Sequence, residues 1–78
     1  MLGERRYPDK FGRLRLPPGG YGQDARGRWW CRAPGGDTVL VPSALVTEHP
    51  DGSITVGAPP LAFNGCRLQI INGRWRTS

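Results

Sequence analysis

The sequence predicts a small all-β protein, a single domain of antiparallel hairpins with about five or six short strands and little or no helix. Three observations favour this fold class. Short apolar runs alternate with polar residues. Glycine and proline, which make up 20 of the 78 residues, fall between those runs. Two of the breaks are strong turn sequences, Pro-Asp-Gly and Asn-Gly. No segment shows a convincing helical period, and residues 41–48 could form at most one turn with Ser43 as its cap.

The chain is expected to divide into a polar N-terminal arm, residues 1–10, and a small β domain, residues 11–78. The first ten residues are polar and show no apolar period. Arginine and leucine then alternate over residues 13–16, which predicts a short half-buried strand. The Pro-Pro-Gly-Gly sequence at residues 17–20 ends this strand.

Four further strands are expected in the middle of the chain. The runs GRWWCRA and TVLVP, each bounded by turn residues, predict the first two. The runs ALVTE and SITV flank a turn in which Pro50 presets φ, Asp51 bonds back to the backbone and Gly52 accepts a positive φ, so they are expected to form a hairpin. Residues 57–65 contain two adjacent prolines and are expected to be a loop or an edge segment.

The last thirteen residues, CRLQIINGRWRTS, predict a β-hairpin. Asn-Gly between two strand-like runs is typical of a type I′ turn, which needs a positive φ at both positions. With Asn72 and Gly73 as the loop, Ile70 lies opposite Trp75, and residues opposite each other share one face of the ribbon. The expected core face carries Cys66, Leu68, Ile70 and Trp75, and the expected outer face carries Arg67, Gln69, Ile71, Arg74 and Arg76.

A basic and aromatic surface is the candidate binding site. Arginine beside an exposed aromatic ring can pair with phosphate and stack on bases. Polar side chains are also what the solvent face of any half-buried hairpin shows. The periodicity leaves open whether Trp29 or Trp30 is the buried tryptophan. The candidate residues are Arg28, Trp30 and Arg32 from the run GRWWCRA, and Arg67, Gln69, Arg74 and Arg76 from the last hairpin.

The net charge of +5 comes from ten Arg and one Lys against six acidic residues. It favours anionic partners through long-range attraction. The excess of arginine over lysine also fits a GC-rich genome, so the charge alone does not identify a nucleic-acid-binding protein.

Residues suited to catalysis or metal binding are few. A zinc site needs about four Cys, His or carboxylate ligands, whereas this chain offers Cys31, Cys66 and His49. We expect His49 to be solvated at its turn and both thiols to be buried, which separates the only Cys–His combination that a nucleophilic mechanism could use. The glycine-rich pieces lack the helix that a phosphate-binding loop needs behind it. No enzymatic activity, metal or cofactor is therefore expected.

The segments FGRLRLPPGGYGQDARGRWWCR, VTEHPDGSITV and INGRWR together resemble a family of small uncharacterised proteins of bacteriophages and prophages from GC-rich hosts. The resemblance covers nearly the whole chain and implies a phage-related source and a small β fold, but no reaction. Residues 57–60 depart from the family's Ser-Pro-Ser-Ile, and residues 66–68 depart from its Trp-His-Gly. A function that depends on the family's histidine is lost, because Arg67 is neither a metal ligand nor a base near neutral pH.

The expected function is that of a non-catalytic interaction module, phage- or prophage-encoded, that binds a protein partner. Such a module would be a virion or capsid accessory or a host-directed factor. Tryptophan and arginine often anchor protein interfaces, and a core this small is marginally stable, so docking or self-association would supplement it. The alternative is a nucleic-acid-binding protein that uses the Arg/Trp face.

The expected location is the host cytoplasm or the virion, without secretion. The first residues, MLGERRYPDK, lack the apolar stretch of a secretory signal. No run reaches the ~18 apolar residues of a membrane helix, so no membrane partner is expected. In a reducing compartment Cys31 and Cys66 are expected to be free thiols.

Overall fold

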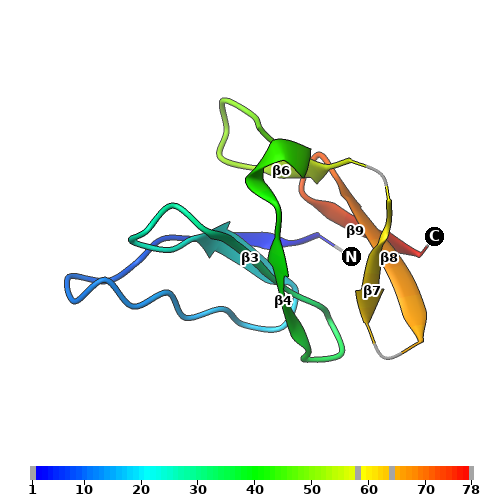
Figure 1. Cartoon of the computed structure of the whole chain (residues 1–78), viewed down its shortest axis with the longest axis horizontal. Helices are drawn as coiled ribbons and strands as arrows, with labels where there is room; N and C mark the ends of the chain where they lie inside the picture. Colours follow the sequence, from blue (N-terminus) through cyan, green and yellow to red (C-terminus); the bar gives the residue numbers. More distant parts are fainter. Residues whose placement is uncertain (1, 58, 64, 78) are drawn as a thin grey trace.

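The computed structural model describes residues 2–57, 59–63 and 65–77, and it confirms the all-β class (Figure 1). These residues form nine short strands and one 3-10 turn, more strands than the sequence predicts. No helix among them is long and apolar enough to cross a membrane. The elements are β1 (Glu4–Arg6), β2 (Gly20–Gln23), β3 (Trp29–Arg32), β4 (Thr38–Val41), η1 (Ser43–Leu45), β5 (Val46–Glu48), β6 (Ile54–Val56), β7 (Leu61–Phe63), β8 (Cys66–Ile71) and β9 (Arg74–Thr77).

The strands form three small sheets. The first has the order β1-β2-β3-β4, the second pairs β5 with β6, and the third has the order β7-β8-β9. Every ladder among the described strands is antiparallel except the one between β1 and β2. In Figure 1 the first sheet lies to the left and the third to the right. They join where Leu2 bridges Arg74 and the N–H of Gly3 donates to the carbonyl of Gly73.

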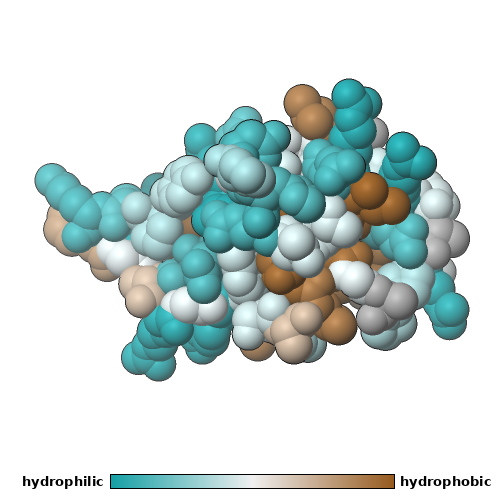
Figure 2. All heavy atoms as spheres, turned by 90° about the horizontal axis from the view of Figure 1, so that it is seen from above, coloured by the Kyte–Doolittle hydropathy of each residue, from teal (hydrophilic) through white to brown (hydrophobic). Residues whose placement is uncertain are grey.

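A single hydrophobic core lies between the three sheets. Trp29, rather than Trp30, is the buried tryptophan of β3, which settles the alternative that periodicity leaves open. The rings of Phe63 and Trp75 meet edge to face with their centroids 5.9 Å apart. Outside the core the surface seen in Figure 2 is mostly hydrophilic, with hydrophobic side chains gathered in a few patches. The core residues are Tyr21, Trp29, Cys31, Ala33, Val41, Ile54, Val56, Leu61, Phe63, Ile70 and Trp75.

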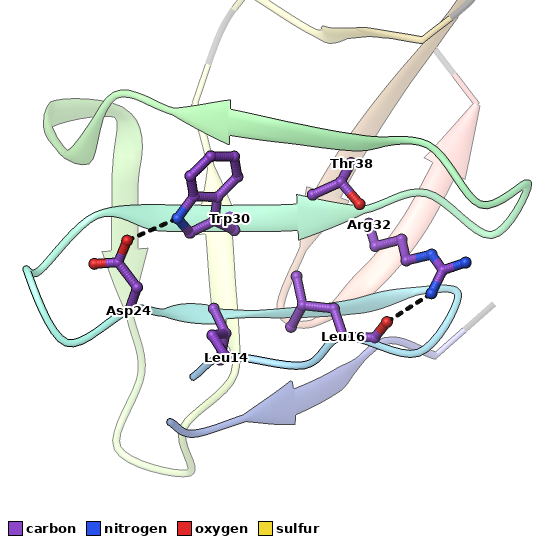
Figure 3. Close-up of a pocket in the computed structure, with 6 residues that line it drawn as sticks. All are labelled: Leu14, Leu16, Asp24, Trp30, Arg32 and Thr38. Carbon is purple, nitrogen blue, oxygen red and sulfur yellow. Dashed lines mark hydrogen bonds between the residues drawn. The ribbon is translucent and has the colours of Figure 1, made fainter. Parts of the chain in front are cut away.

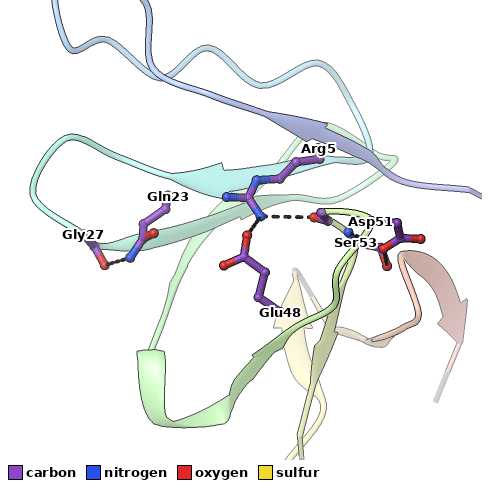
Figure 4. A network of polar contacts seen from close by, with 7 residues as sticks. Arg5, Gln23, Gly27, Glu48, Asp51 and Ser53 are labelled. Atoms are coloured by element: carbon purple, nitrogen blue, oxygen red, sulfur yellow. Dashed lines mark hydrogen bonds and ion pairs between the residues drawn. The ribbon is translucent and has the colours of Figure 1, made fainter.

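Residues 4–6, which the sequence places in a polar arm, form β1 and pair in parallel with β2; Met1 lies outside the described residues. The inward-facing residue of β1 is Arg5, whose side chain is only 12% exposed. Its guanidinium carbon lies 4.6 Å and 4.8 Å from the ring centroids of Tyr7 and Trp29. Its Nη1 pairs with Glu48 Oε2 at 2.6 Å (Figure 4). Cation–π contacts and an ion pair thus fix a strand that has no apolar residue facing the core.

The predicted strand at residues 13–16 is wrong, although its alternation is real. Residues 11–19 form no strand but cross over the first sheet, and we call them the crossing segment. Leu14 and Leu16 in it are half-buried, and Arg13 and Arg15 are exposed. β2 already has β1 and β3 on its two sides, so no ladder position beside β2 is left for this segment. A Cβ on Gly22 would lie 3.1 Å from Leu14 Cδ1, so the bare glycine lets the segment approach the sheet closely.

The two predicted hairpins with strong turn sequences form as expected. Val46–Glu48 pairs with Ile54–Val56 across a turn in which Gly52 has a φ of 88°. In the last hairpin Ile70 lies opposite Trp75, and Asn72 and Gly73 have φ values of 49° and 77°. Both φ values are positive, as a type I′ turn requires.

Three smaller expectations need correction or refinement. Cys66, predicted on the core face, is exposed, because a hollow of about 310 Å³ between the start of β8 and the β3–β4 turn leaves it uncovered. Ser43 does not cap a helical turn, since Pro42 holds the cap position of η1 and no side chain caps it. Residues 57–65, expected as a loop or edge segment, include the edge strand β7, with residues 58 and 64 outside the described part.

The β8–β9 turn is the point where the three sheets meet. The N–H of Gly73 donates to the carbonyl of Ile54 in β6, and its carbonyl accepts the N–H of Gly3, next to β1. The backbone N–H of Asn72 donates to Thr55 Oγ1. In addition, the indole Nε1 of Trp75 donates to the carbonyl of Gly19 at 2.8 Å. Gly73 is consequently buried, although it lies at the tip of a hairpin.

Replacing Gly73 with alanine is expected to lower the free energy of unfolding by more than about 1 kcal/mol, because the residue has a positive φ. Its Cβ would also lie 2.8 Å from the Tyr21 hydroxyl oxygen and 2.9 Å from Ser53 Cβ. Urea unfolding followed by tryptophan fluorescence measures the change. Gly35→Ala is the matched control, because a Cβ there meets nothing within 4 Å, and it should stay within about 0.5 kcal/mol of the wild type. Equal stability of Gly73→Ala and Gly35→Ala would contradict the close packing of the β8–β9 turn against Tyr21 and Ser53.

Candidate binding surfaces

The seven candidate residues lie on two separate surfaces. Strand β3 turns Trp29 and Cys31 inward, and β8 and β9 turn Ile70 and Trp75 inward. Because these inner faces share one core, the outer faces of the two sheets point away from it in different directions. We call Arg28, Trp30 and Arg32 the Trp30 face, and Arg67, Gln69, Arg74 and Arg76 the hairpin face.

The Trp30 face borders a hollow of about 330 Å³ (Figure 3). The half-buried indole of Trp30 lies on one side, and Leu14 and Leu16 from the crossing segment lie on the other. Asp24 and Arg32 stand at opposite ends of the row of side chains in Figure 3. The hollow is therefore apolar in the middle and charged at its ends.

Asp24 holds the indole in place. Its Oδ2 accepts hydrogen bonds from Trp30 Nε1 at 2.9 Å and from Arg28 Nε at 2.8 Å. Its Oδ1 accepts the backbone N–H groups of Arg26 and Arg28, each at 2.9 Å. The bond from Trp30 is the main reason that the pKa of this carboxyl lies well below its usual range, and the bonds from Arg28 and Arg26 lower it further. One carboxylate thereby fixes both the β2–β3 turn and the position of Trp30.

The two arginines of the Trp30 face already have partners. Arg28 pairs with Asp24, and its guanidinium carbon lies 5.8 Å from the Trp30 ring centroid. Arg32 donates from Nε to the carbonyl of Gly36 at 2.9 Å and from Nη1 to the carbonyl of Leu16 at 2.8 Å. These contacts fix the β3–β4 turn and the crossing segment. The first role of both arginines is to position the walls of the hollow.

The hairpin face is different, because its arginines are exposed. No ion pair or hydrogen bond links the guanidinium groups of Arg67, Arg74 or Arg76 to any residue that the structure describes. The stretch from residue 66 to residue 77 contains no acidic residue. Its one aromatic residue, Trp75, faces the core. This face can attract anions but offers no ring on which a base could stack.

No hydrogen bond among the described residues links either cysteine to His49. Cys31 is fully buried, and this burial raises the pKa of its thiol to about 12, which disfavours the reactive thiolate. His49, expected to be solvated, is half-buried, and its Nε2 shares a hydrogen bond with Thr55 Oγ1 at 2.7 Å. Among the residues described, no three His, Cys, Asp or Glu side chains are grouped so that they could hold a metal ion.

Sequence reasoning missed the far wall of the hollow and its key carboxylate. The alternation predicts that Leu14 and Leu16 belong to a strand, and nothing in the sequence pattern singles out Asp24 as a partner of Trp30. The sequence Asp-Ala-Arg-Gly is typical of an Asx turn, so the backbone contacts of Asp24 could have been found. Its bond to Trp30, six residues on, depends on how β3 leaves that turn.

Comparison of the chain with protein-family models, with curated protein sequences and with solved structures finds no match. The phage family suggested by the turn motifs therefore stays an expectation. The roles of the two surfaces follow from their geometry, charge and exposure.

Asp24→Asn is expected to change how stability depends on pH. The native pKa of Asp24 lies below its unfolded value of ~3.9, so the carboxylate stabilises the fold above that pH. This stabilisation is lost as the pH falls through the native pKa. Melting temperatures measured by circular dichroism should show the variant less stable at neutral pH, with the gap closing in acid. Glu4→Gln, which removes an exposed carboxylate, controls for the loss of one charge; a gap that is constant with pH would exclude this role for Asp24.

Proposed function

We propose that the protein is a small non-catalytic interaction module, phage- or prophage-encoded, that binds a protein partner through the Trp30 face. The observation that supports this proposal is the hollow of about 330 Å³ beside a half-buried indole. Its size lies at the lower end of the ~300–1,000 Å³ of typical ligand sites. Tryptophan and arginine are the residues that most often carry interface energy.

The indole is held in place before any partner arrives. Trp30 is fixed by Asp24, and Leu16 is held through its carbonyl by Arg32. Side chains that are already ordered lose little conformational entropy on binding, so more of the contact energy contributes to affinity. Rigid aromatic anchors in a shallow hollow are therefore well suited to a binding module.

The chemistry of the hollow indicates the kind of segment that it would accept. Leu14, Leu16 and the indole would contact one apolar side chain of an extended peptide. The charge of Arg32 at one end favours an acidic residue next to that apolar side chain, because neither hydrogen bond of Arg32 neutralises it. The net charge of +5 would steer such an acidic partner toward the protein.

A comparison of variants by affinity purification tests the proposal. Tagged wild-type protein and Trp30→Ala are each exposed to lysates of phage-infected host cells, and bound proteins are quantified by mass spectrometry. We expect one phage or host protein whose capture falls about tenfold or more with Trp30→Ala. It should be unchanged with Arg67→Ala on the hairpin face. Circular dichroism shows that each variant is folded. Equal capture by wild type and Trp30→Ala would refute the role of this face.

Binding of nucleic acid through the hairpin face is the second candidate function. The observation in its favour is that three exposed arginines have no carboxylate partner among the described residues. Because no aromatic ring accompanies them, they would contact phosphates rather than bases. Duplex and single-stranded probes of any sequence should then bind similarly, and the affinity should fall steeply with salt.

Fluorescence anisotropy with a labelled duplex over a range of salt concentrations tests this alternative. Replacing both Arg74 and Arg76 with glutamine should reduce the slope of log affinity against log salt by about 2, because each phosphate contact contributes roughly one unit. Arg28→Gln is the control and should leave the slope unchanged, since Asp24 already pairs with Arg28. No binding by the wild type at low salt, or a slope that the double variant does not change, would exclude the hairpin face.

A further inference from the structure

Another hollow, also of about 310 Å³ but separate from the one beside Cys66, lies at the end of β1. It is formed by the end of β1, the residues after it and the crossing segment. We call it the N-terminal hollow. It is lined by Arg5, Arg6, Tyr7, Asp9, Arg13 and Arg15. None of these residues belongs to the Trp30 face or the hairpin face.

A tight turn brings the arginines of the crossing segment back toward β1. Asp9 Oδ1 accepts the backbone N–H groups of Phe11 and Arg13 at 2.9 Å and 3.0 Å. The backbone N–H of Asp9 in turn donates to the carbonyl of Arg13 at 2.9 Å, and Gly12 turns the chain with a φ of 77°. The carboxylate of Asp9 therefore fixes the turn, and its Oδ1 already accepts two hydrogen bonds there.

The alternation of residues 13–16 now has a structural meaning. Leu14 and Leu16 line the hollow beside Trp30, whereas Arg13 and Arg15 line the N-terminal hollow. Successive side chains of an extended segment point to opposite sides. One short segment thus supplies an apolar wall to one site and a cationic wall to another.

The N-terminal hollow carries more positive charge than its neighbours neutralise. Arg5 pairs with Glu48, and Arg6 pairs with Glu4 at 3.0 Å. The guanidinium groups of Arg13 and Arg15 form no ion pair or hydrogen bond with any residue that the structure describes. In addition, Arg5 Nε is buried without an acceptor among those residues. Asp9 supplies the one carboxylate in the lining.

We propose that the N-terminal hollow binds a phosphate group. Guanidinium groups match the oxygens of phosphate with paired, charge-assisted hydrogen bonds, and several of them converging in a concave site focus the field on one anion. A concave site suits a compact phosphate, such as pyrophosphate or the terminal phosphate of a nucleic-acid strand. This site is independent of the proposed protein-binding function, because it uses different side chains.

Titration with pyrophosphate, followed by backbone amide NMR at constant ionic strength, tests the site. The wild type should show saturable shifts that centre on residues 5–15. Arg13→Gln and Arg15→Gln should each weaken binding about tenfold, because each removes a charge-assisted contact. Both side chains are exposed, so both variants should fold. Arg76→Gln removes the same charge from the hairpin face and should change the affinity by less than about twofold.

A pair of oligonucleotides of one sequence, with and without a 5′-phosphate, distinguishes the two sources of the phosphate. Tighter binding of the phosphorylated strand, lost in Arg13→Gln, identifies a strand terminus. Equal binding of both strands together with saturable pyrophosphate binding identifies a free phosphate. Absence of saturable pyrophosphate binding, or equal weakening by Arg76→Gln and Arg13→Gln, would overturn the site, because either result means that only the general charge of the protein attracts the anion.

Discussion

The backbone of Gly73 is the constraint on which the rest of the structure depends. Its N–H and carbonyl groups connect the third sheet to β6 and to the start of β1. The tip of a hairpin is usually exposed and tolerant of substitution, but this tip is buried against Tyr21 and Ser53. Glycine is therefore required twice, first by the positive φ of a type I′ turn and second by the lack of space for a side chain. The two-stranded sheet of β5 and β6 is too small to be stable alone, so it depends on contacts of this kind with its neighbours.

The sequence predicts those parts of the fold that depend on neighbouring residues. The register of the last hairpin and the hairpin around Pro50 follow from turn chemistry and from side-chain alternation. It does not predict β1, because the inward residue of that strand is Arg5 and its partner, Glu48, is 43 residues away. It also misassigns residues 13–16, since alternation shows which side chains share a face but not whether a segment lies in a sheet or on top of it.

The same limit applies to the candidate surfaces. Arg28 and Arg67 look alike in the sequence, each beside apolar residues in a strand, yet Arg28 is bonded to Asp24 and Arg67 is exposed without an ion pair among the described residues. Composition and periodicity reveal where the charge is, whereas only the structure reveals which charges have partners. The sequence therefore predicts one basic surface, whereas the fold separates these residues into the Trp30 face and the hairpin face. It also gives no sign of the N-terminal hollow, because that hollow forms only when the turn at Asp9 folds back.

The hydrogen bond between Gly3 and Gly73 also affects the order in which the chain can fold. Leu2 and Gly3, directly before β1, find their partners Arg74 and Gly73 only after the last hairpin turn has been synthesised. Contacts between segments so distant in the chain carry a large loop-closure cost and slow the search for the native state. All ladders of the first sheet lie within residues 4–41, so that sheet can pair before the last hairpin exists, whereas the contact between Gly3 and Gly73 can close only after that hairpin has formed.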